Sequence, residues 1–357
     1  MNKNVNELLQ MMAGMKASDL HLKVPSAPVM RVDGVPVFQE EIGQLTAEDL
    51  EKAFEQITYP EQRAQFEKVK ELDFAYTVPG LARFRVNALR QRGTLSLAFR
   101  LIPFEVPSFE ELGLPPVSKE LVLKPRGMIL VTGPTGSGKS TTLAAMIDYL
   151  NQTTSRTVIT IEDPIEFVYK DRKCLIAQRE LGDDTLSFGA ALKHAMRHDP
   201  DVVVIGEMRD LETISTAIMA AETGHLILAT LHTIDAAQTV DRIIDVFPHD
   251  QQRQIRLQLA QVIQAIMCQT LLPKAGGSRV AAFEVMLATS AIRKLIHDEK
   301  IWEIPANMEL STQEGMQTLD QALAKLVKDG LVSLEDAQTK SNNKAKLTRF
   351  LEYLAEG

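Results

Sequence analysis

The chain has 357 residues, of which 45% are hydrophobic and 24% charged, and its net charge is -8 with a pI near 5.5. This length and composition indicate a globular protein with two domains or one large one. The acidic balance argues against a sequence-independent nucleic-acid binder, which needs a basic surface to displace counterions from phosphates. We therefore expect no nucleic-acid partner.

The first 102 residues predict an α+β domain. An apolar stripe at helical spacing predicts a helix packed on this domain, with membrane-surface binding as the alternative. The stripe consists of Val5, Leu8, Leu9, Met12 and Met15. Residues 29–37 predict a hairpin, Thr46 and Asp49 have the spacing of a capping box, and residues 83–102 alternate as strands do.

The sequence shows neither the pattern of a secretory signal nor that of a membrane-spanning segment. The N-terminus lacks the charged-then-apolar order of a secretory signal, and no apolar run reaches the ~20 residues that span a bilayer. We expect a soluble, cytoplasmic protein without a transmembrane segment.

A proline-rich stretch at residues 103–118 follows the first domain. Its prolines are Pro103, Pro107, Pro115 and Pro116. Proline lacks a backbone donor and restricts the residue before it, so we expect an interdomain linker that holds one short helix at Ser108 to Leu112.

Residues 119–288 alternate short apolar strands with helices. The strands are expected at 127–133, 157–163, 201–207 and 225–233. Such a pattern predicts a parallel sheet that is buried on both faces. Residues 289–357 predict a helical region in which Ser333 caps one amphipathic helix. Cys174 and Cys268 are too distant in sequence for a Cys-x-x-Cys site, so we expect buried thiols.

One segment between a strand and a helix has the pattern G-x-x-x-x-G-K-[ST] of a phosphate-binding loop. In such a loop the glycines let backbone amides curl around phosphates, the lysine reaches the β and γ phosphates, and the hydroxyl binds Mg²⁺. We expect ATP and Mg²⁺ here. The nucleotide-binding residues are Gly133, Pro134, Thr135, Gly136, Ser137, Gly138, Lys139, Ser140 and Thr141.

Polar side chains follow the apolar strands and should meet this loop, because ligands bind beyond the carboxyl ends of parallel strands. They are Glu162, Asp163, Glu207, His232 and Thr233. Gly206 stands where an aspartate commonly holds Mg²⁺, so Glu207 is the nearest carboxylate and can hold the ion through a water. Glu162 is placed to orient or deprotonate the attacking water. This division of roles is a hypothesis.

Two histidines and three arginines are further candidates. His232 is expected to respond to the γ-phosphate, with a structural histidine as the alternative. His225 precedes the same strand, and both a functional and a packing role stay open. Arginines that follow the developing charge assist phosphoryl transfer. Arg83, Arg85 and Arg100 should share one strand face that caps a nucleotide, unless that face is simply solvated.

Taken together, these blocks resemble the secretion and type IV pilus ATPase family, and most closely its retraction (PilT-type) members. The match runs in order along nearly the whole chain through "SDLHL", "RFRVNA", "GPTGSGKST", "TIEDPIEF", "VVVIGEMRD", "GHLILATLHT" and "GMQTLDQAL". The family's strand ends in Gly-Glu, so Gly206 fits the family pattern.

The resemblance implies a PAS-like N-terminal domain, a flexible linker and a RecA-like ATPase domain. It implies a homohexameric ring with ATP between domains, docked in the cytoplasm beneath an inner-membrane pilus platform protein, where it removes pilin subunits. It also implies that Glu162 is catalytic, that Glu207 is linked to magnesium, that His225 and His232 form a histidine-box pair and that the three arginines lie near the nucleotide.

Three alternatives stay open. The stretch "AIRKLIHDEK" departs from the "AIRNLIRE" of retraction motors, which leaves a paralogous accessory motor of the PilU kind. A RecA-like nucleic-acid motor would share the core, although the acidic charge and few aromatic residues disfavour it. A nucleotide-gated scaffold without turnover is the third. Assembly motors of this family carry a four-cysteine zinc insert, which two cysteines cannot build.

Overall fold

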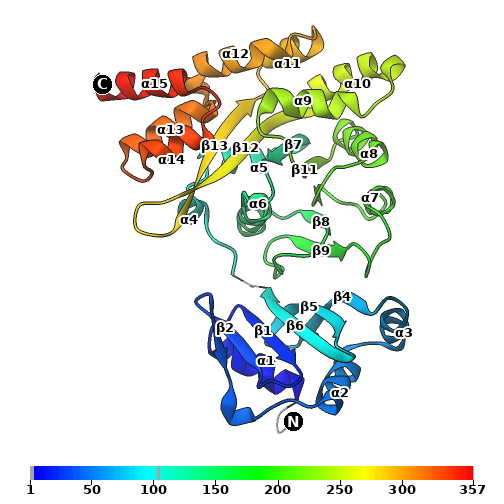
Figure 1. The fold of residues 1–357 in the computed structure, drawn as a ribbon. Coiled ribbons are helices and arrows are strands. Elements are labelled where there is room, and N and C mark those ends of the chain that lie inside the picture. The colour runs from blue at the N-terminus through cyan, green and yellow to red at the C-terminus, as the bar shows by residue number, and fades with distance from the viewer. Residues whose placement is uncertain (1–3, 103–104, 357) are drawn as a thin grey trace. The chain divides into compact units, whose positions relative to one another are not determined.

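The computed structural model describes residues 4–102 and 105–356 and divides the chain into two compact units (Figure 1). The first unit comprises residues 1–105 and 166–168, and the second comprises residues 106–165 and 169–357. The boundary at residue 105 falls within the expected linker segment, of which Pro103 lies outside the described residues.

The first unit is an antiparallel sheet covered by helices. Its strand order is β3-β2-β1-β6-β5-β4. The strands are β1 (Asp19–Lys23), β2 (Val29–Val32), β3 (Val35–Phe38), β4 (Glu71–Val78), β5 (Ala82–Gln91) and β6 (Thr94–Ile102). The helices are α1 (Val5–Gly14), η1 (Glu40–Ile42), α2 (Ala47–Ile57) and α3 (Pro60–Val69).

Local signals in the first unit are confirmed. Thr46 and Asp49 form the capping box at the start of α2. β2 and β3 form the expected hairpin. The stripe of α1 is buried at Val5, Leu8, Leu9 and Met12 within the same apolar core as the inward side chains of β5 and β6. Met15, the last residue of the predicted stripe, follows the end of α1 and is exposed, so this part of the prediction was wrong. The unit is thus the α+β domain that the sequence predicts.

The second unit contains a seven-stranded sheet in the order β13-β12-β7-β11-β10-β8-β9. All neighbouring pairs from β12 to β9 are parallel, whereas β13 is antiparallel to β12. The strands are β7 (Gly127–Thr132), β8 (Thr157–Glu162), β9 (Leu175–Glu180), β10 (Val202–Ile205), β11 (Leu226–Leu231), β12 (Ile263–Pro273) and β13 (Arg279–Leu287).

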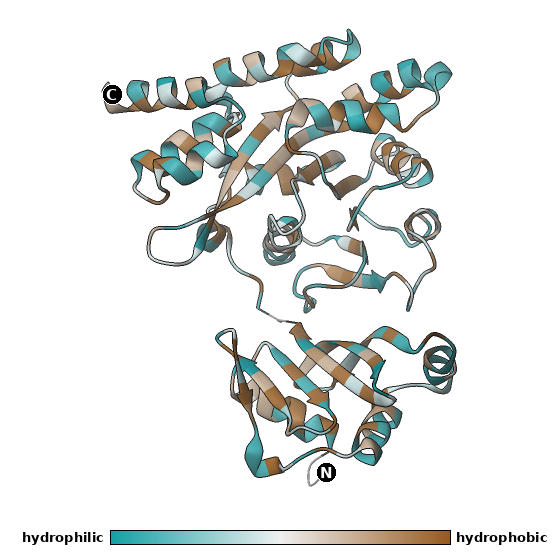
Figure 2. Cartoon of the chain, in the orientation of Figure 1, coloured by the Kyte–Doolittle hydropathy of each residue, from teal (hydrophilic) through white to brown (hydrophobic). Residues whose placement is uncertain are grey.

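Both faces of this sheet are buried, as the continuous apolar strands predict. Alternate residues of β7, β10 and β11 enter two separate apolar clusters, one on each face. Figure 2 shows these strands largely in the brown of apolar residues. The helices up to the end of the sheet are α4 (Phe109–Leu112), α5 (Val117–Val122), α6 (Lys139–Thr153), α7 (Phe188–Ala195), α8 (Leu211–Glu222), α9 (Ala236–Asp245) and α10 (His249–Val262).

The C-terminal region is helical, as expected. It contains α11 (Ser290–His297), η2 (Ile301–Glu303), α12 (Ile304–Leu310), η3 (Thr312–Glu314), α13 (Leu319–Lys328), α14 (Leu334–Lys340) and α15 (Lys344–Glu356). Ser333 caps α14, as predicted. Within residues 4–102 and 105–356, none of the helices has the length and apolar character needed to cross a membrane.

Candidate functional site

The segment between β7 and α6 has the form of a phosphate-binding loop. Gly133, Gly136 and Gly138 have φ angles of 141°, 78° and 91°, in a region that glycine enters without steric cost. Gly138 is the N-cap of α6 and provides no side-chain cap, so the first-turn N–H groups of this 15-residue helix are left for a ligand. Ser140 and Thr141 lie half-buried in that first turn.

Lys139 folds back over the loop. Its side-chain Nζ donates to the carbonyls of Gly133 at 2.9 Å and Pro134 at 3.2 Å, and it lies 3.5 Å from His232 Nδ1. Lys139 is 8% exposed. The cation therefore stands beside the loop backbone, where it complements the dipole of the helix N-terminus in attracting an anion.

Glu207 follows β10 and lies between the side chains of Arg209 and His232. Its Oε2 accepts from Arg209 at 2.6 Å and its Oε1 lies 3.0 Å from His232 Nε2. Burial opposes ionisation of Glu207, but the hydrogen bonds from Arg209 and His232 outweigh it, so the pKa of this carboxyl is lowered. The structure thus connects Lys139, His232 and Glu207 at one edge of the sheet, as the parallel topology predicts.

Gly206 follows β10 and lies against the end of β8. Its N–H donates to the carbonyl of Ile161 at 2.7 Å, and a methyl group at this position would lie 3.1 Å from that oxygen and 3.3 Å from Glu162 Cα. A side chain here would push the Glu162 strand end away. Glycine therefore keeps Glu162 and Glu207 on adjacent strand ends.

The Glu162 carboxylate accepts hydrogen bonds from two side chains of its own sheet. Its Oε1 accepts from Thr160 Oγ1 at 2.6 Å and from Gln178 Nε2 at 3.1 Å, and the residue is half-buried. Neither Thr160 nor Gln178 stood out in the sequence. Both lie on paired positions of β8 and β9, which only the fold brings together.

Within this chain the fold does not bring His225 close to Lys139, Glu207 and His232. It precedes β11, whereas His232 follows it, so the two are separated by the strand length of about 20 Å. His225 Nδ1 lies 2.9 Å from the carbonyl of Ala220 at the end of α8. Within this chain His225 therefore ties a helix end to the amino end of the sheet.

The three predicted arginines belong to the first unit and share one sheet face. Arg83 and Arg85 are two residues apart on β5, and Arg85 lies opposite Arg100 on β6. Arg100 Nε donates to Asp19 Oδ1 at 2.8 Å. Arg85 and Arg100 are exposed and Arg83 is half-buried. Their contact with a nucleotide stays a prediction.

The residues of the loop edge fit ATP and Mg²⁺. A buried serine in the loop, Ser137, is 3% exposed, and its Oγ has no hydrogen-bond partner among the described residues. No three His, Cys, Asp or Glu side chains gather to hold a metal ion by themselves in the described part of the chain. Mg²⁺ usually takes one or two protein oxygens together with phosphate and water oxygens, so Ser140 and Glu207 suit it.

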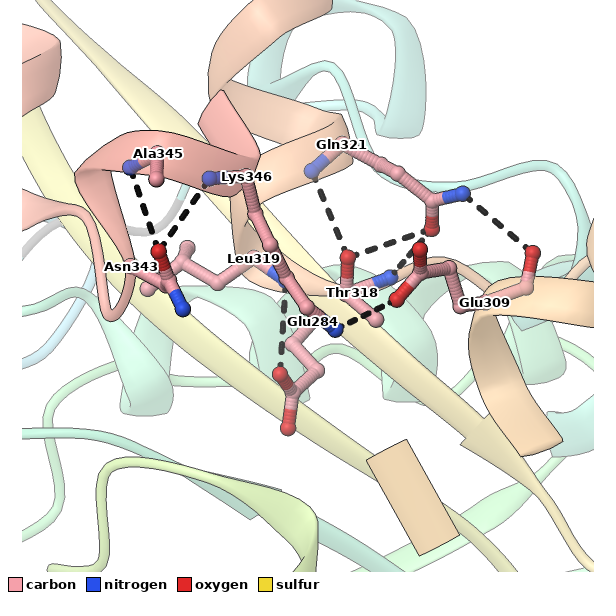
Figure 3. A network of polar contacts seen from close by, with 8 residues as sticks. All are labelled: Glu284, Glu309, Thr318, Leu319, Gln321, Asn343, Ala345 and Lys346. Carbon is pink, nitrogen blue, oxygen red and sulfur yellow. Dashed lines mark hydrogen bonds and ion pairs between the residues drawn. The ribbon is translucent and has the colours of Figure 1, made fainter. Parts of the chain in front are cut away.

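A second polar group lies at the starts of α9 and α13. Glu284 on β13 is 6% exposed, and its two oxygens accept from the N–H of Ala236 at 2.8 Å and of Leu319 at 3.3 Å, the first residues of α9 and α13. Figure 3 shows the bond from the Leu319 N–H to Glu284 and, in the same region, the pair of Lys346 with Glu309 at 2.6 Å. The surrounding cavity of about 740 Å³ is also lined by Asp235, the N-cap of α9, and by Asp241, Glu299 and Asp320.

The cysteines are buried, as predicted, with Cys174 and Cys268 each 2% exposed. Burial raises the pKa of both thiols. Neither is poised as a nucleophile or a metal ligand.

Comparison with known proteins bears on the site. The family model of type II/IV secretion system proteins matches residues 72–278. The chain is 49% identical to the type IV pilus retraction ATPase PilT of Pseudomonas aeruginosa over 95% of this chain and 98% of that one. It is 41% identical to the type IV pilus ATPase PilU of the same organism, over 93% and 87% of the two chains.

A solved structure is similar along nearly the whole fold. A crystal structure of the pilus retraction motor PilT with bound ADP superposes with a TM-score of 0.90 at 46% identity, covering 97% of this chain and 99% of that chain. The site geometry and the family match lead to the same conclusion, because the structure has a phosphate loop and pairs Glu207 with His232. The chain belongs to the type II/IV secretion system protein family, as a nucleotide-using ATPase of its PilT type.

Proposed function

We propose that this chain is an ATP-hydrolysing motor that powers the retraction of type IV pili. The observation that carries the proposal is 49% identity to a pilus retraction ATPase over 95% of the chain. The intact loop edge, in which His232 contacts both Lys139 and Glu207, supports hydrolysis rather than nucleotide binding alone.

In this proposal the loop binds the triphosphate. The first-turn amides of α6 and the Lys139 ammonium hold the phosphate oxygens, and Ser140 and Glu207 hold Mg²⁺. Bound Mg²⁺ neutralises charge on the β and γ phosphates. Glu207 stays ionised because Arg209 and His232 lower the pKa of its carboxyl.

Glu162 is the proposed base. Its Oε1 accepts hydrogen bonds from Thr160 and Gln178, which orient the carboxylate. It would accept a proton from the attacking water while Lys139 stabilises the charge that develops on the phosphate. His232 contacts both Lys139 and Glu207, so it is suited to respond when the γ-phosphate leaves.

The motor is proposed to act as a homohexamer in the cytoplasm, docked against an inner-membrane platform protein. In a ring, the cationic face of Arg83, Arg85 and Arg100 would supply positive charge to a nucleotide, because arginines provided by another domain or subunit commonly assist phosphoryl transfer. His225 would act on packing in such a ring rather than on the phosphate held by its own chain.

The purified chain provides the test. We expect Mg-dependent ATP hydrolysis, loss of nucleotide binding in Lys139→Ala, and retained binding with turnover reduced at least about 100-fold in Glu162→Gln. Glu212→Gln is the matched control, because Glu212 is a surface glutamate paired with Lys193 at 2.5 Å. Undetectable hydrolysis by the wild-type hexamer would contradict the proposal, and stimulation by single-stranded DNA would favour a nucleic-acid motor.

An accessory retraction motor is the second candidate, favoured by the α11 sequence. Ile292 and Ile296 are buried and Leu295 packs against the same core, so the helix is retained. The differing positions Lys294 and His297 are exposed. The difference therefore lies on the helix surface, where it would alter what the motor touches rather than how it folds.

A further inference from the structure

Gln269 is a buried polar residue in an apolar strand. It lies on β12 and is 4% exposed, directly after Cys268, which pairs with Thr132 at the end of β7. A buried amide requires hydrogen-bond partners for both its oxygen and its nitrogen. The partners of Gln269 are found in the phosphate loop and in the helix that follows it.

The two ends of this amide join the loop to its helix. Gln269 Nε2 donates to the carbonyl of Ser137 at 2.6 Å, and Gln269 Oε1 accepts from Thr142 Oγ1 at 2.8 Å. Thr142 lies near the start of α6 and is 2% exposed. Both hydrogen bonds are therefore shielded from water, which would otherwise compete for them.

Gln269 also restricts the side chains that fit at two positions of the phosphate loop. A methyl group at position 133 would lie 2.3 Å from the backbone oxygen of Gln269, and one at position 138 would lie 3.1 Å from its Nε2. Gln269 thus lies against two of the three loop glycines as well as bonding Ser137.

We propose that Gln269 is a positioning residue that holds the phosphate loop in its binding shape before a nucleotide arrives. This inference rests on the nucleotide binding in the proposed function, though not on pilus retraction. A loop that is already ordered loses less conformational entropy on binding, so the clamp raises nucleotide affinity. The two ends of the Gln269 amide bond the Ser137 carbonyl and the Thr142 hydroxyl, so we infer that it acts through the loop.

The test compares ADP affinity and ATPase kinetics of the full-length chain. Gln269→Leu removes both hydrogen bonds, and Thr142→Val removes one while keeping the side-chain shape. The matched control is Gln264→Leu on the same strand, where Gln264 Nε2 lies 3.5 Å from the carbonyl of Arg126, at the strand end opposite the loop.

We expect Gln269→Leu to raise the Kd for ADP and the KM for ATP about tenfold or more, with kcat at saturating ATP within about threefold of wild type. Thr142→Val should give a smaller rise of the same kind, and Gln264→Leu none. A purely structural role would lower the melting temperature without this separation of KM from kcat.

Wild-type ADP affinity in correctly folded Gln269→Leu and Thr142→Val would overturn the inference while leaving the proposed function intact. If Gln269→Leu does not fold, the folded Thr142→Val decides the question. Absence of ADP binding in the wild-type chain would overturn the proposed function itself, so the two failures are distinguishable.

Discussion

Glu284 should make the stability of α9 and α13 depend on pH. Burial raises the pKa of its carboxyl from 4.5 to about 7, against the opposing effect of the hydrogen bonds from the Ala236 and Leu319 amides. When α9 and α13 open, the side chain meets water and its pKa returns to 4.5. The folded state therefore binds a proton more tightly than the opened state does.

The sign and magnitude follow from linkage. Between the two pKa values the folded state carries more bound protons, so stability falls as pH rises, by about 1.4 kcal/mol per pH unit. From pH 5.5 to pH 8 the loss amounts to about 2 kcal/mol, because the change levels off above the folded pKa of about 7. Glu284→Gln cannot ionise, so this loss should vanish in the variant.

Hydrogen exchange measured by mass spectrometry provides the assay. The free energy of opening is determined for peptides that cover α9 and α13, at pH 5.5 and pH 8, after correction for the intrinsic exchange rate. Glu309→Gln is the control, because it breaks the pair with Lys346 in the same region but retains Glu284. An equal pH dependence in Glu284→Gln and wild type would refute the reasoning.

The remaining predictions concern the loop edge. Gly206→Ala should destabilise the protein by about 1–3 kcal/mol and lower ATPase activity, because its methyl group would lie 3.1 Å from the Ile161 oxygen; an unchanged melting temperature would argue against this crowding. His232→Asn should slow hydrolysis while His225→Asn mainly lowers the melting temperature of the purified chain, and the reverse pattern would contradict the positions seen here. Cys268, 2% exposed, should resist thiol reagents until the protein unfolds, and rapid labelling of the native chain would be inconsistent with its burial.

Most of the second unit's architecture could be predicted from the order of strands and helices along the chain. Four apolar strands separated by helices predicted a parallel sheet, and this topology alone placed Glu162, Glu207 and His232 at one edge. The phosphate loop was evident because its glycine spacing coincides with a strand-to-helix junction. These features are local in sequence, which is why a single sequence shows them.

Three strands and the contacts made by Thr160, Gln178 and Gln269 were not predicted. β12 follows α10 with no breaker between Val262 and Ile263, so the apolar run gave no boundary, and β9 and β13 were equally unmarked. Gln269 is one of three polar residues in β12, with Gln264 and Thr270, and its partners are 127 and 132 positions away in sequence. Only the folded sheet brings them together. The glutamine within a buried strand was the one signal available.

The central claim is that this ATPase drives pilus retraction, and imaging of labelled pili in living cells tests it most directly. Cells lacking the gene should carry pili that extend but do not shorten, and retraction should return with the wild-type chain but not with Glu162→Ala. Normal retraction in the deletion strain would contradict the account and point to an accessory motor. Cells without pili would also contradict it, because they would identify an assembly motor.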